Sequence, residues 1–553
     1  MREKLIIPLL IAVVVGLPLA LRHHDAPPAH ADDTLVIIGP QTNAVRDEFT
    51  RAFRDSWRQQ TGREVALDWR TVGGASDITR YLNSTYTGVF RNYWENELHR
   101  PWSAAVEQGF ANPRLTPDAV PPAGADAKQR AEFAEAVAAR QAFLASNLSV
   151  GIDVFFGGGS YDFSQQAARG QLVANGVEQR HPDWFTPAIF PLEFAGEALR
   201  DAQGCWEGTA LSTFGLIFNR DRLQAVNFSG EPTRWADLTD PRFAGAVALA
   251  DPTQSASNAK AFEMIVQQQM QQSVAAAGNA TTPSLAALAA GWQAGMQLIQ
   301  LASANSAYYT DYAAKPNLDV AAGDCAIGMS IDFYGRMEEE TIIQRNPTDP
   351  ARAHRFGYLM PRGGSSLSAD PIGLLRGAPH PDVARAFIDF VLSVDGQKLW
   401  NFRPGTPGGP ATHALRRSPI RRDLYDPVWR PYLSDPDVLP YEETGDFVYH
   451  ASWTSPVFSE LRFVIKAAFI DPHPELAAAW SSIQRARAEG RTAAATAALA
   501  KLQDLTAIDY AAVNGPIKTA LAGGPLGRLD LEAQLNDHFR QQYAAARVLA
   551  DGP

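Results

Sequence analysis

Short runs of β-forming residues alternate with longer stretches of helical spacing between Asp33 and about Leu399. Residues 35–38 are apolar throughout, as expected of a strand buried on both faces. Residues 45–59 then carry an apolar side chain at every fourth position, which predicts a helix. Residues 65–69 and 154–156 read as two further strands. This order predicts an α/β fold whose sheet contains parallel strands.

The 553-residue chain is too long for one compact core, so two lobes are expected. Residues 91–145 form an insertion between the second and third strands, with a Pro- and Ala-rich loop before a helix. The Ala-rich stretch 477–501 has a helical composition.

Three glycine- or serine-bearing turns follow predicted strands, at residues 72–77 (VGGASD), 157–162 (GGGSYD) and 250–257 (ADPTQSAS). Ligands of open α/β sheets bind outside the carboxyl ends of the strands. Glycines let a backbone approach a ligand closely, and a following helix start offers free N–H groups. Tight strand-to-helix turns, with helix capping by Ser255 or Ser257, explain the same residues without a ligand.

The N-terminus has the three parts of a secretory signal. Arg2 and Lys4 precede an uncharged stretch, residues 5–21, and Ala29-His30-Ala31 supplies the small-residue exit. We expect cleavage after Ala31; an uncleaved anchor is the alternative. The net charge of −11 argues against nucleic acid or an anionic membrane as the main partner.

The chain has two cysteines, Cys205 and Cys325, which could form one disulfide or stay as two separate thiols. Two cysteines are too few for a zinc site built on cysteine. No G-x-S-x-G, H-E-x-x-H, C-x-x-C or P-loop pattern is present, so an enzyme is not expected. An exported hydrolase is the lesser alternative. We expect no cofactor and no resident metal.

Several ordered segments carry a resemblance to a known family: 153–159 (DVFFGGG), 214–221 (FGLIFNRD), 232–238 (PTRWADL), 240–243 (DPRF), 250–253 (ADPT), 370–375 (DPIGLL) and 378–381 (APHP). Together they resemble bacterial extracellular (periplasmic) solute-binding proteins of ABC importers, in the branch that binds ferric iron, phosphonates or sugar phosphates. The resemblance covers roughly residues 33–410.

The resemblance implies a periplasmic-binding-protein-like fold of two α/β lobes that close like a hinge on a small ligand. Lobe one would hold residues 32–210 and 359–410, and lobe two residues 211–358. The crossings would lie at 205–219 and 356–359. Residues 411–553 would form a mainly helical C-terminal region that packs on the lobes. The implied partner is an ABC-transporter permease, the location periplasmic, and the receptor a monomer.

One short segment decides between metal and organic ligands. Ferric-binding relatives carry two adjacent tyrosines after a strand of lobe two, and the matching positions here are Phe333 and Tyr334. Fe(III) prefers oxygen donors, and phenylalanine has none, so Phe333 weakens the hypothesis that the protein binds ferric iron. A ferric-iron-binding transport protein stays as an alternative. The pair Tyr308-Tyr309 precedes the strand, in an expected helix or loop, and is read as packing.

We therefore expect a small polar or anionic ligand. Arg336 would suit a phosphate or carboxylate, whereas Asp332 would suit a sugar hydroxyl or an amine, or would cap a helix. The expected contacts lie on the turns, the first crossing and the segment after the lobe-two strand: Gly74, Ser76, Ser160, Tyr161, Ser212, Thr213, Ser255, Ser257, Asp332 and Tyr334.

Overall fold

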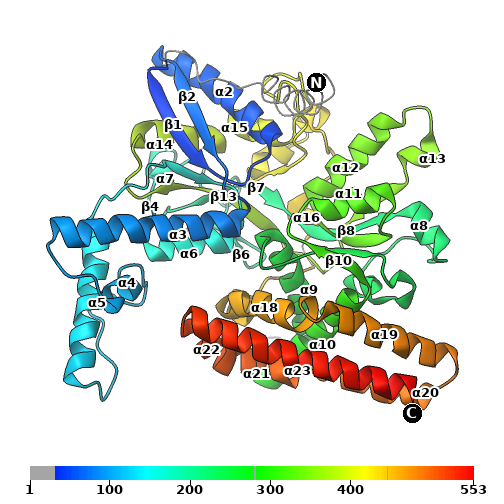
Figure 1. Cartoon of the computed structure of the whole chain (residues 1–553). Coiled ribbons are helices and arrows are strands. Elements are labelled where there is room, and N and C mark those ends of the chain that lie inside the picture. The colour runs from blue at the N-terminus through cyan, green and yellow to red at the C-terminus, as the bar shows by residue number, and fades with distance from the viewer. Residues whose placement is uncertain (1–30, 279–281, 445, 553) are drawn as a thin grey trace, which may run out of the picture.

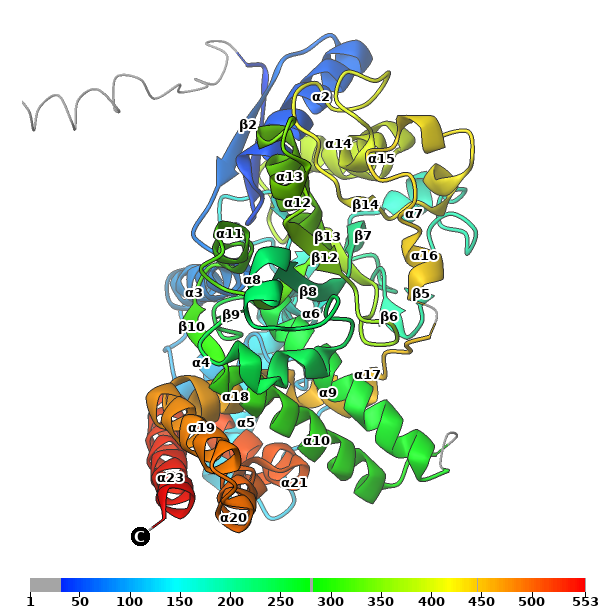
Figure 2. The same cartoon turned by 90° about the vertical axis from the view of Figure 1, so that its right-hand side faces the viewer.

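The computed structural model describes residues 31–278, 282–444 and 446–552. Apart from Ala31, the expected signal segment lies outside these residues. The described chain contains two large sheets, each covered by helices, and a separate layer of C-terminal helices (Figures 1 and 2). Within the described residues, no helix is both long and apolar enough to cross a membrane.

The first sheet has the order β14-β7-β13-β3-β1-β2, with β4 beside β13. Strand β1 pairs in parallel with β2 and β3, whereas β13 is antiparallel to β3 and β7. The three strands expected from the N-terminal part of the sequence are confirmed. The bounds are β1 Asp33–Ile38, β2 Val65–Arg70, β3 Val154–Phe156, β4 Leu172–Val173, β7 Glu207–Ser212, β13 Ser368–Leu375 and β14 Ser418–Pro419.

Both faces of this sheet are buried, which explains the apolar run in β1. Leu35 and Ile37 point into one core and Val36 and Ile38 into another, because successive side chains of a strand face opposite sides. The first core includes α2 (Asn43–Thr61), α14 (Pro381–Leu392) and α15 (Val394–Asn401), and the second includes α3 (Ala75–Asn92), α5 (Ala127–Ala145) and α6 (Ser160–Arg169).

The insertion after α3 contains two helices that project from the first lobe, α4 (Ala104–Gly109) and α5 (Figure 1). They approach closely at Gly109, where a Cβ atom would lie 2.6 Å from the Cα of Ala136. Shorter elements follow along the first lobe: α7 Val177–Arg180, β5 Glu193–Phe194 and β6 Glu197–Ala198.

The second sheet has the order β10-β9-β11-β8-β12. Its strands are β8 Phe214–Asn219, β9 Val247–Ala250, β10 Ser306–Thr310, β11 Ile327–Ile331 and β12 Phe356–Leu359. Its helices are α8 Arg220–Ala225, α9 Ala256–Ala276, α10 Leu285–Ala304, α11 Lys315–Ala322, α12 Asp332–Arg345 and α13 Pro350–Ala353. The expected helix or loop at Tyr308-Tyr309 is wrong, since both residues lie in β10, paired with β9.

Two connections join the sheets. Strands β7 and β8 belong to different sheets and are separated by Thr213 alone. The second connection, residues 360–367, runs from β12 back to β13. Cys205 and Cys325 lie just before β7 and β11, and both are free thiols, so the disulfide alternative is wrong.

The C-terminal region divides between the lobes. Strand β14 pairs with β7 of the first sheet, and Tyr441 packs against the core of the first lobe. From Phe447 onward most of the buried hydrophobic residues belong to the core of the second lobe. Trp292 of α10 donates to the carbonyl of Ile508 at 3.1 Å, which ties the two parts of that core together.

The C-terminal helices form a layer against α10 (Figure 2). Two helices, α19 and α20, cover most of the Ala-rich stretch expected to be helical. The helices of this region are α16 Pro440–Glu443, α17 Ala451–Thr454, α18 Phe458–Ile465, α19 His473–Ala488, α20 Thr492–Leu502, α21 Tyr510–Ala512, α22 Lys518–Ala522 and α23 Pro525–Asp551.

Candidate functional site

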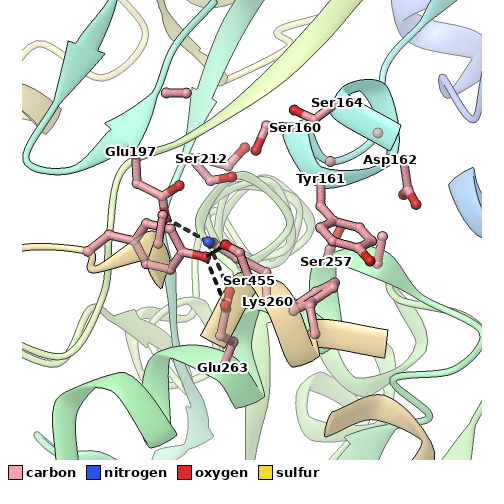
Figure 3. A pocket seen from close by; sticks show the side chains of 18 of the residues that line it. Ser160, Tyr161, Asp162, Ser164, Glu197, Ser212, Ser257, Lys260, Glu263 and Ser455 are labelled. Carbon is pink, nitrogen blue, oxygen red and sulfur yellow. Dashed lines mark hydrogen bonds and ion pairs between the residues drawn. The ribbon is translucent and has the colours of Figure 1, made fainter. Parts of the chain in front are cut away.

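A cavity of about 510 Å³ lies between the two lobes (Figure 3). The first lobe contributes the start of α6, the β5–β6 hairpin, the last residue of β7 and the start of β13. The second lobe contributes the start of α9, the first residue of β8 and the last residue of β11. Residues from Tyr449 to Phe458 of the C-terminal region form a further wall. The cavity, which we call the inter-lobe cavity, therefore has walls from three separate parts of the chain.

The glycine turn before α6 is required by close packing. Gly157 and Gly158 both have positive φ, at 89° and 127°. A Cβ atom at Gly157 would lie 2.2 Å from Nε2 of Gln41, and one at Gly158 would lie 2.9 Å from the Cβ of Ala75. Glycine is the residue that tolerates such backbone and such proximity. The turn places the first residues of α6, Ser160 and Tyr161, on the cavity wall (Figure 3).

Ser212 ends β7 directly before the first crossing and also lines the cavity. Its side chain is buried, and its Oγ has no hydrogen-bond partner among the described protein groups. Buried hydroxyls are nearly always hydrogen-bonded in folded proteins, so an unpartnered one needs a reason. A ligand group in the cavity would supply the missing partner.

A buried ion-pair cluster occupies one side of the cavity (Figure 3). The Nζ of Lys260, on α9, lies 2.7 Å from Glu197 of β6 and 3.0 Å from Glu263. The ring of Tyr449 lies 3.5 Å from the same nitrogen, and its hydroxyl donates to Glu263 at 2.8 Å. These four residues, which we call the Lys260 cluster, connect both lobes and the C-terminal region.

The protonation of the cluster follows from burial and charge. Burial alone lowers the pKa of Lys260, but the two carboxylates outweigh it, so this pKa lies above its ordinary value. Burial raises the pKa of Glu197, and Lys260 opposes that change. Among the described residues that line the cavity, Lys260 is the one cation, against Asp162, Glu193, Glu197, Glu263 and Asp370. The cavity is therefore acidic.

Asp370, on β13, also lines the cavity, and burial raises its pKa to about 6 although Arg417 opposes the change. The guanidinium of Arg417 lies 2.5 Å from a carboxylate oxygen of Asp370 and 3.9 Å from the ring centre of Phe333. Phe333 therefore stacks on an arginine at the junction of the lobes. The adjacent Tyr334 packs against Phe333, with ring centres 4.4 Å apart.

Of the ten residues expected to contact a ligand, Ser160, Tyr161, Ser212 and Ser257 line the inter-lobe cavity. Gly74, Thr213, Asp332 and Tyr334 do not line it, and neither do Ser76 and Ser255. Several of these have partners in the fold. Thr213 lies 3.3 Å from the Tyr358 hydroxyl, Asp332 pairs with Arg336 at 2.5 Å, and Ser255 caps α9 by accepting from the N–H of Asn258.

Helix α18 contacts the loops of both lobes. Arg462 donates to the hydroxyl of Ser76 at 2.7 Å and to the carbonyls of Pro252 and Thr253 at 2.7 and 3.1 Å. The Tyr161 hydroxyl lies 3.0 Å from that of Ser459. The C-terminal region therefore bridges the same loops that the sequence points to as ligand-binding turns.

Sequence reasoning missed the Lys260 cluster and every C-terminal wall residue. The four members of the cluster are separated along the chain by up to 252 positions, from Glu197 to Tyr449, and belong to no recognisable motif. The lysine and Glu263 share one helix face at i,i+3 spacing, but this pattern is typical of exposed helices. Among the residues that the structure describes, no group of three or more His, Cys, Asp or Glu side chains is arranged to hold a metal ion.

Two curated proteins are similar to parts of this chain. An uncharacterised protein of Haemophilus influenzae is 25% identical over 247 residues, which is 45% of this chain and 60% of that protein. The phosphoglycerate transport regulatory protein PgtC of Salmonella typhimurium is 27% identical over 191 residues, 34% of this chain and 39% of that protein. The chain thus spans less than two thirds of either relative.

Solved structures that are similar include the periplasmic binding protein AfuA from Actinobacillus pleuropneumoniae with fructose-6-phosphate bound, at 17% identity and a TM-score of 0.49, covering 79% of this chain and 99% of that one. Iron-bound HitA from Pseudomonas aeruginosa is another, at 14% identity and a TM-score of 0.44, covering 78% and 98%.

The model of one protein family matches residues 151–430, about half of the chain. The matched segment begins before β3, includes both crossings between the sheets, and contains the whole second sheet. The protein belongs to the family of bacterial extracellular solute-binding proteins.

Proposed function

We propose that this protein is a receptor that captures a small polar ligand between its lobes and delivers it to the membrane permease of an ABC importer. The observation that carries the proposal is the inter-lobe cavity of about 510 Å³, whose walls come from both lobes. Pockets of roughly 300–1,000 Å³ are typical of small-molecule sites. Because the lobes are joined by short connections, a change in their separation would open or close this cavity.

The family and one relative support a transport role. Members of the matched family are extracellular solute-binding proteins, which agrees with the secretory signal expected at the N-terminus. The name of the Salmonella typhimurium relative also refers to transport. We infer that the receptor acts outside the cytoplasm, as a monomer and without catalysis.

The lining of the inter-lobe cavity favours a ligand with hydroxyl or cationic groups at this position. Its one lysine is already held by two carboxylates, so within the described part of the chain the lining offers no unpaired cation to an anionic ligand. Ser160, Ser212 and Ser257 offer hydroxyls, and the rings of Tyr161 and Phe458 lie 4.7 Å apart at one end. Hydroxyls with aromatic surface suit a polyol or an amine.

Direct ferric binding gains no support from this arrangement. Phe333 has no oxygen and stacks on Arg417, and Tyr334 does not line the inter-lobe cavity. A cation of high charge would also meet the positive side chain of Arg417 at this junction. Organic ligands remain the proposal.

The test is to identify a ligand that purifies with the mature chain by native mass spectrometry. A screen by thermal unfolding follows, because a ligand that binds the folded state raises its stability. The screen includes sugars, amino acids, polyamines, sugar phosphates, phosphonates and ferric complexes. We expect stabilisation by one polar organic class.

A substitution that fills the inter-lobe cavity provides the matched control. Ser257→Trp places an indole at the cavity wall and should abolish ligand stabilisation. Ser273→Trp lies on the same helix but does not line the cavity, so it should leave ligand binding intact. Equal effects of the two changes, or no response to any ligand class, would overturn the proposal.

A further inference from the structure

A second cavity, of about 280 Å³, adjoins the inter-lobe cavity and shares wall residues with it. It is lined by α3 and α6 of the first lobe, by Thr253 of the second lobe, and by α18 and α23 of the C-terminal region. Tyr161 and Asp162 border both cavities, and Figure 3 shows Asp162 beyond Tyr161 as seen from Lys260. We call it the arginine cavity.

Four guanidinium groups line this small space: those of Arg80, Arg169, Arg462 and Arg528. Arg80 forms an ion pair with Asp77 on its own helix. No ion pair within the described residues includes Arg169, Arg462 or Arg528. Asp162 is the one carboxylate in the lining. The arginine cavity therefore has an excess of positive charge, opposite to the inter-lobe cavity.

Two of these arginines are partly removed from water. Burial lowers the pKa of Arg169 and of Arg462, which means that surrounding negative charge does not fully compensate these cations. Arg80 also lowers the pKa of Arg462, because like charges near one another interact unfavourably. An anion between them would remove that repulsion.

Hydrogen-bond donors accompany the charges. The hydroxyls of Ser76, Thr79 and Ser459 and the amides of Asn83 and Gln165 also line the arginine cavity. The Oγ1 of Thr79 is buried and has no partner within the described protein. Guanidinium groups bind phosphate and carboxylate oxygens through paired N–H donors, and hydroxyls add to such sites.

We propose that the arginine cavity is an anion site that binds a phosphate group, either as free phosphate or as part of an organic molecule. The charge and the donors come from three parts of the chain, so the site exists only when the C-terminal region is docked on both lobes. Arg462 and Arg528 lie beyond residue 430, outside the segment that the family model matches. The site goes beyond the proposed capture of a ligand in the inter-lobe cavity and does not depend on it.

The test measures binding of inorganic phosphate to the mature full-length chain by calorimetry, at constant ionic strength and pH 7.5. Removing one guanidinium that contacts phosphate should weaken the affinity by about tenfold or more, as for other charged hydrogen bonds. Arg169→Gln and Arg528→Gln should both show this loss. Arg547→Gln, on the same helix α23 and exposed, should bind phosphate as the unaltered chain does.

A variant that binds phosphate more tightly provides a control for misfolding. Asp162→Asn removes the one carboxylate from the lining and should tighten phosphate binding several-fold, which an unfolded variant could not do. Absence of phosphate binding by the unaltered chain would overturn the proposal. Equal affinities for the chain with Arg169→Gln and with Arg547→Gln would overturn it as well.

Two further measurements separate the sources of the phosphate group and the two cavities. If glycerol phosphate binds more tightly than inorganic phosphate, the group belongs to an organic molecule; if inorganic phosphate binds as well or better, free phosphate is the ligand. In either case, Arg169→Gln should weaken the binding of both compounds. Ser257→Trp, which fills the inter-lobe cavity, should leave inorganic phosphate binding unchanged, so failure of the receptor function and failure of the anion site give different outcomes.

Discussion

The two cavities that Tyr161 borders have opposite electrostatic character. The inter-lobe cavity has five carboxylates in its lining and one lysine, which two of them, Glu197 and Glu263, already hold. The arginine cavity has four guanidinium groups and one carboxylate. A single aromatic side chain borders both. The difference shows that one cleft between lobes can present two chemistries, because the lobes supply the carboxylates of the inter-lobe cavity and the C-terminal region adds Arg462 and Arg528 to the arginine cavity.

The Lys260 cluster gives the largest expected effect on stability. Lys260→Met leaves Glu197 and Glu263 buried without their cation, and breaking a buried ion pair in this way costs about 3–5 kcal/mol. Urea unfolding measures the change. Lys315→Met removes a lysine that stays about half exposed in its ion pair with Asp319, and should cost less than about 1 kcal/mol. Similar losses in both variants would mean that the cluster does not stabilise the fold.

The carboxylate of Asp162, which borders both cavities, should make the free energy of unfolding depend on pH. Burial raises the pKa of Asp162 from 3.8 to about 6 in the folded protein, although Arg462 opposes the change. Below about pH 3 this carboxyl is protonated in both the folded and the unfolded state and costs nothing. Above about pH 6 it is charged while buried, which destabilises the folded state by about 3 kcal/mol.

Asp162→Asn should therefore raise the free energy of unfolding more at pH 8 than at pH 4, and the two increases should differ by roughly 3 kcal/mol. Urea unfolding of both chains at the two pH values gives the comparison. A difference between the chains that does not vary with pH would show that the Asp162 carboxyl is not the source.

The bridge from α18 gives an intermediate effect. Arg462→Gln removes hydrogen bonds to Ser76 of the first lobe and to Pro252 and Thr253 of the second, and should cost about 2 kcal/mol. Arg485→Gln, which removes an exposed pair with Asp551, should change the unfolding free energy by less than about 1 kcal/mol. If Arg462 also holds the two lobes together, small-angle X-ray scattering should detect a larger radius of gyration for Arg462→Gln but not for Arg485→Gln.

The hydroxyl at the crossing should give the smallest change in stability. Ser212→Ala removes a buried oxygen that has no protein partner, so the free energy of unfolding should change by less than about 0.5 kcal/mol. Ligand binding in the inter-lobe cavity should nevertheless weaken. Ser303→Ala removes a hydroxyl bonded to the Ile299 carbonyl at 2.7 Å and should cost about 1 kcal/mol. The reverse order of these two stability losses would contradict this view of Ser212.

Local sequence patterns predicted much of the fold. The apolar run in β1 and the four-residue spacing in α2 depend on neighbouring residues, which is why both elements lie where expected. The glycine turn before α6 was also recognisable, because positive φ and close packing demand glycine there. Tyr308-Tyr309 was misplaced since a short run before a longer strand has no decisive periodicity, and its pairing with β9 comes from distant sequence.

The candidate site was only partly predictable. Ser160 and Ser212 were predicted because they follow or end strands, where α/β folds place ligands, and both line the inter-lobe cavity. Ser76 was found on the same ground, but α18 covers it and leaves it on the wall of the arginine cavity. Nothing in the spacing of residues 447–552 indicates that they would reach the cleft.

By itself, the sequence determined the α/β class, the division into two lobes and the family, because these follow from periodicity and from motifs within short segments. Only the tertiary structure decided the character of the cleft. It brought Glu197, Lys260 and Tyr449 together and placed Arg462 and Arg528 beside α6. Charges separated by hundreds of residues interact only after the chain has folded, since their distances depend on the packing of all the elements between them.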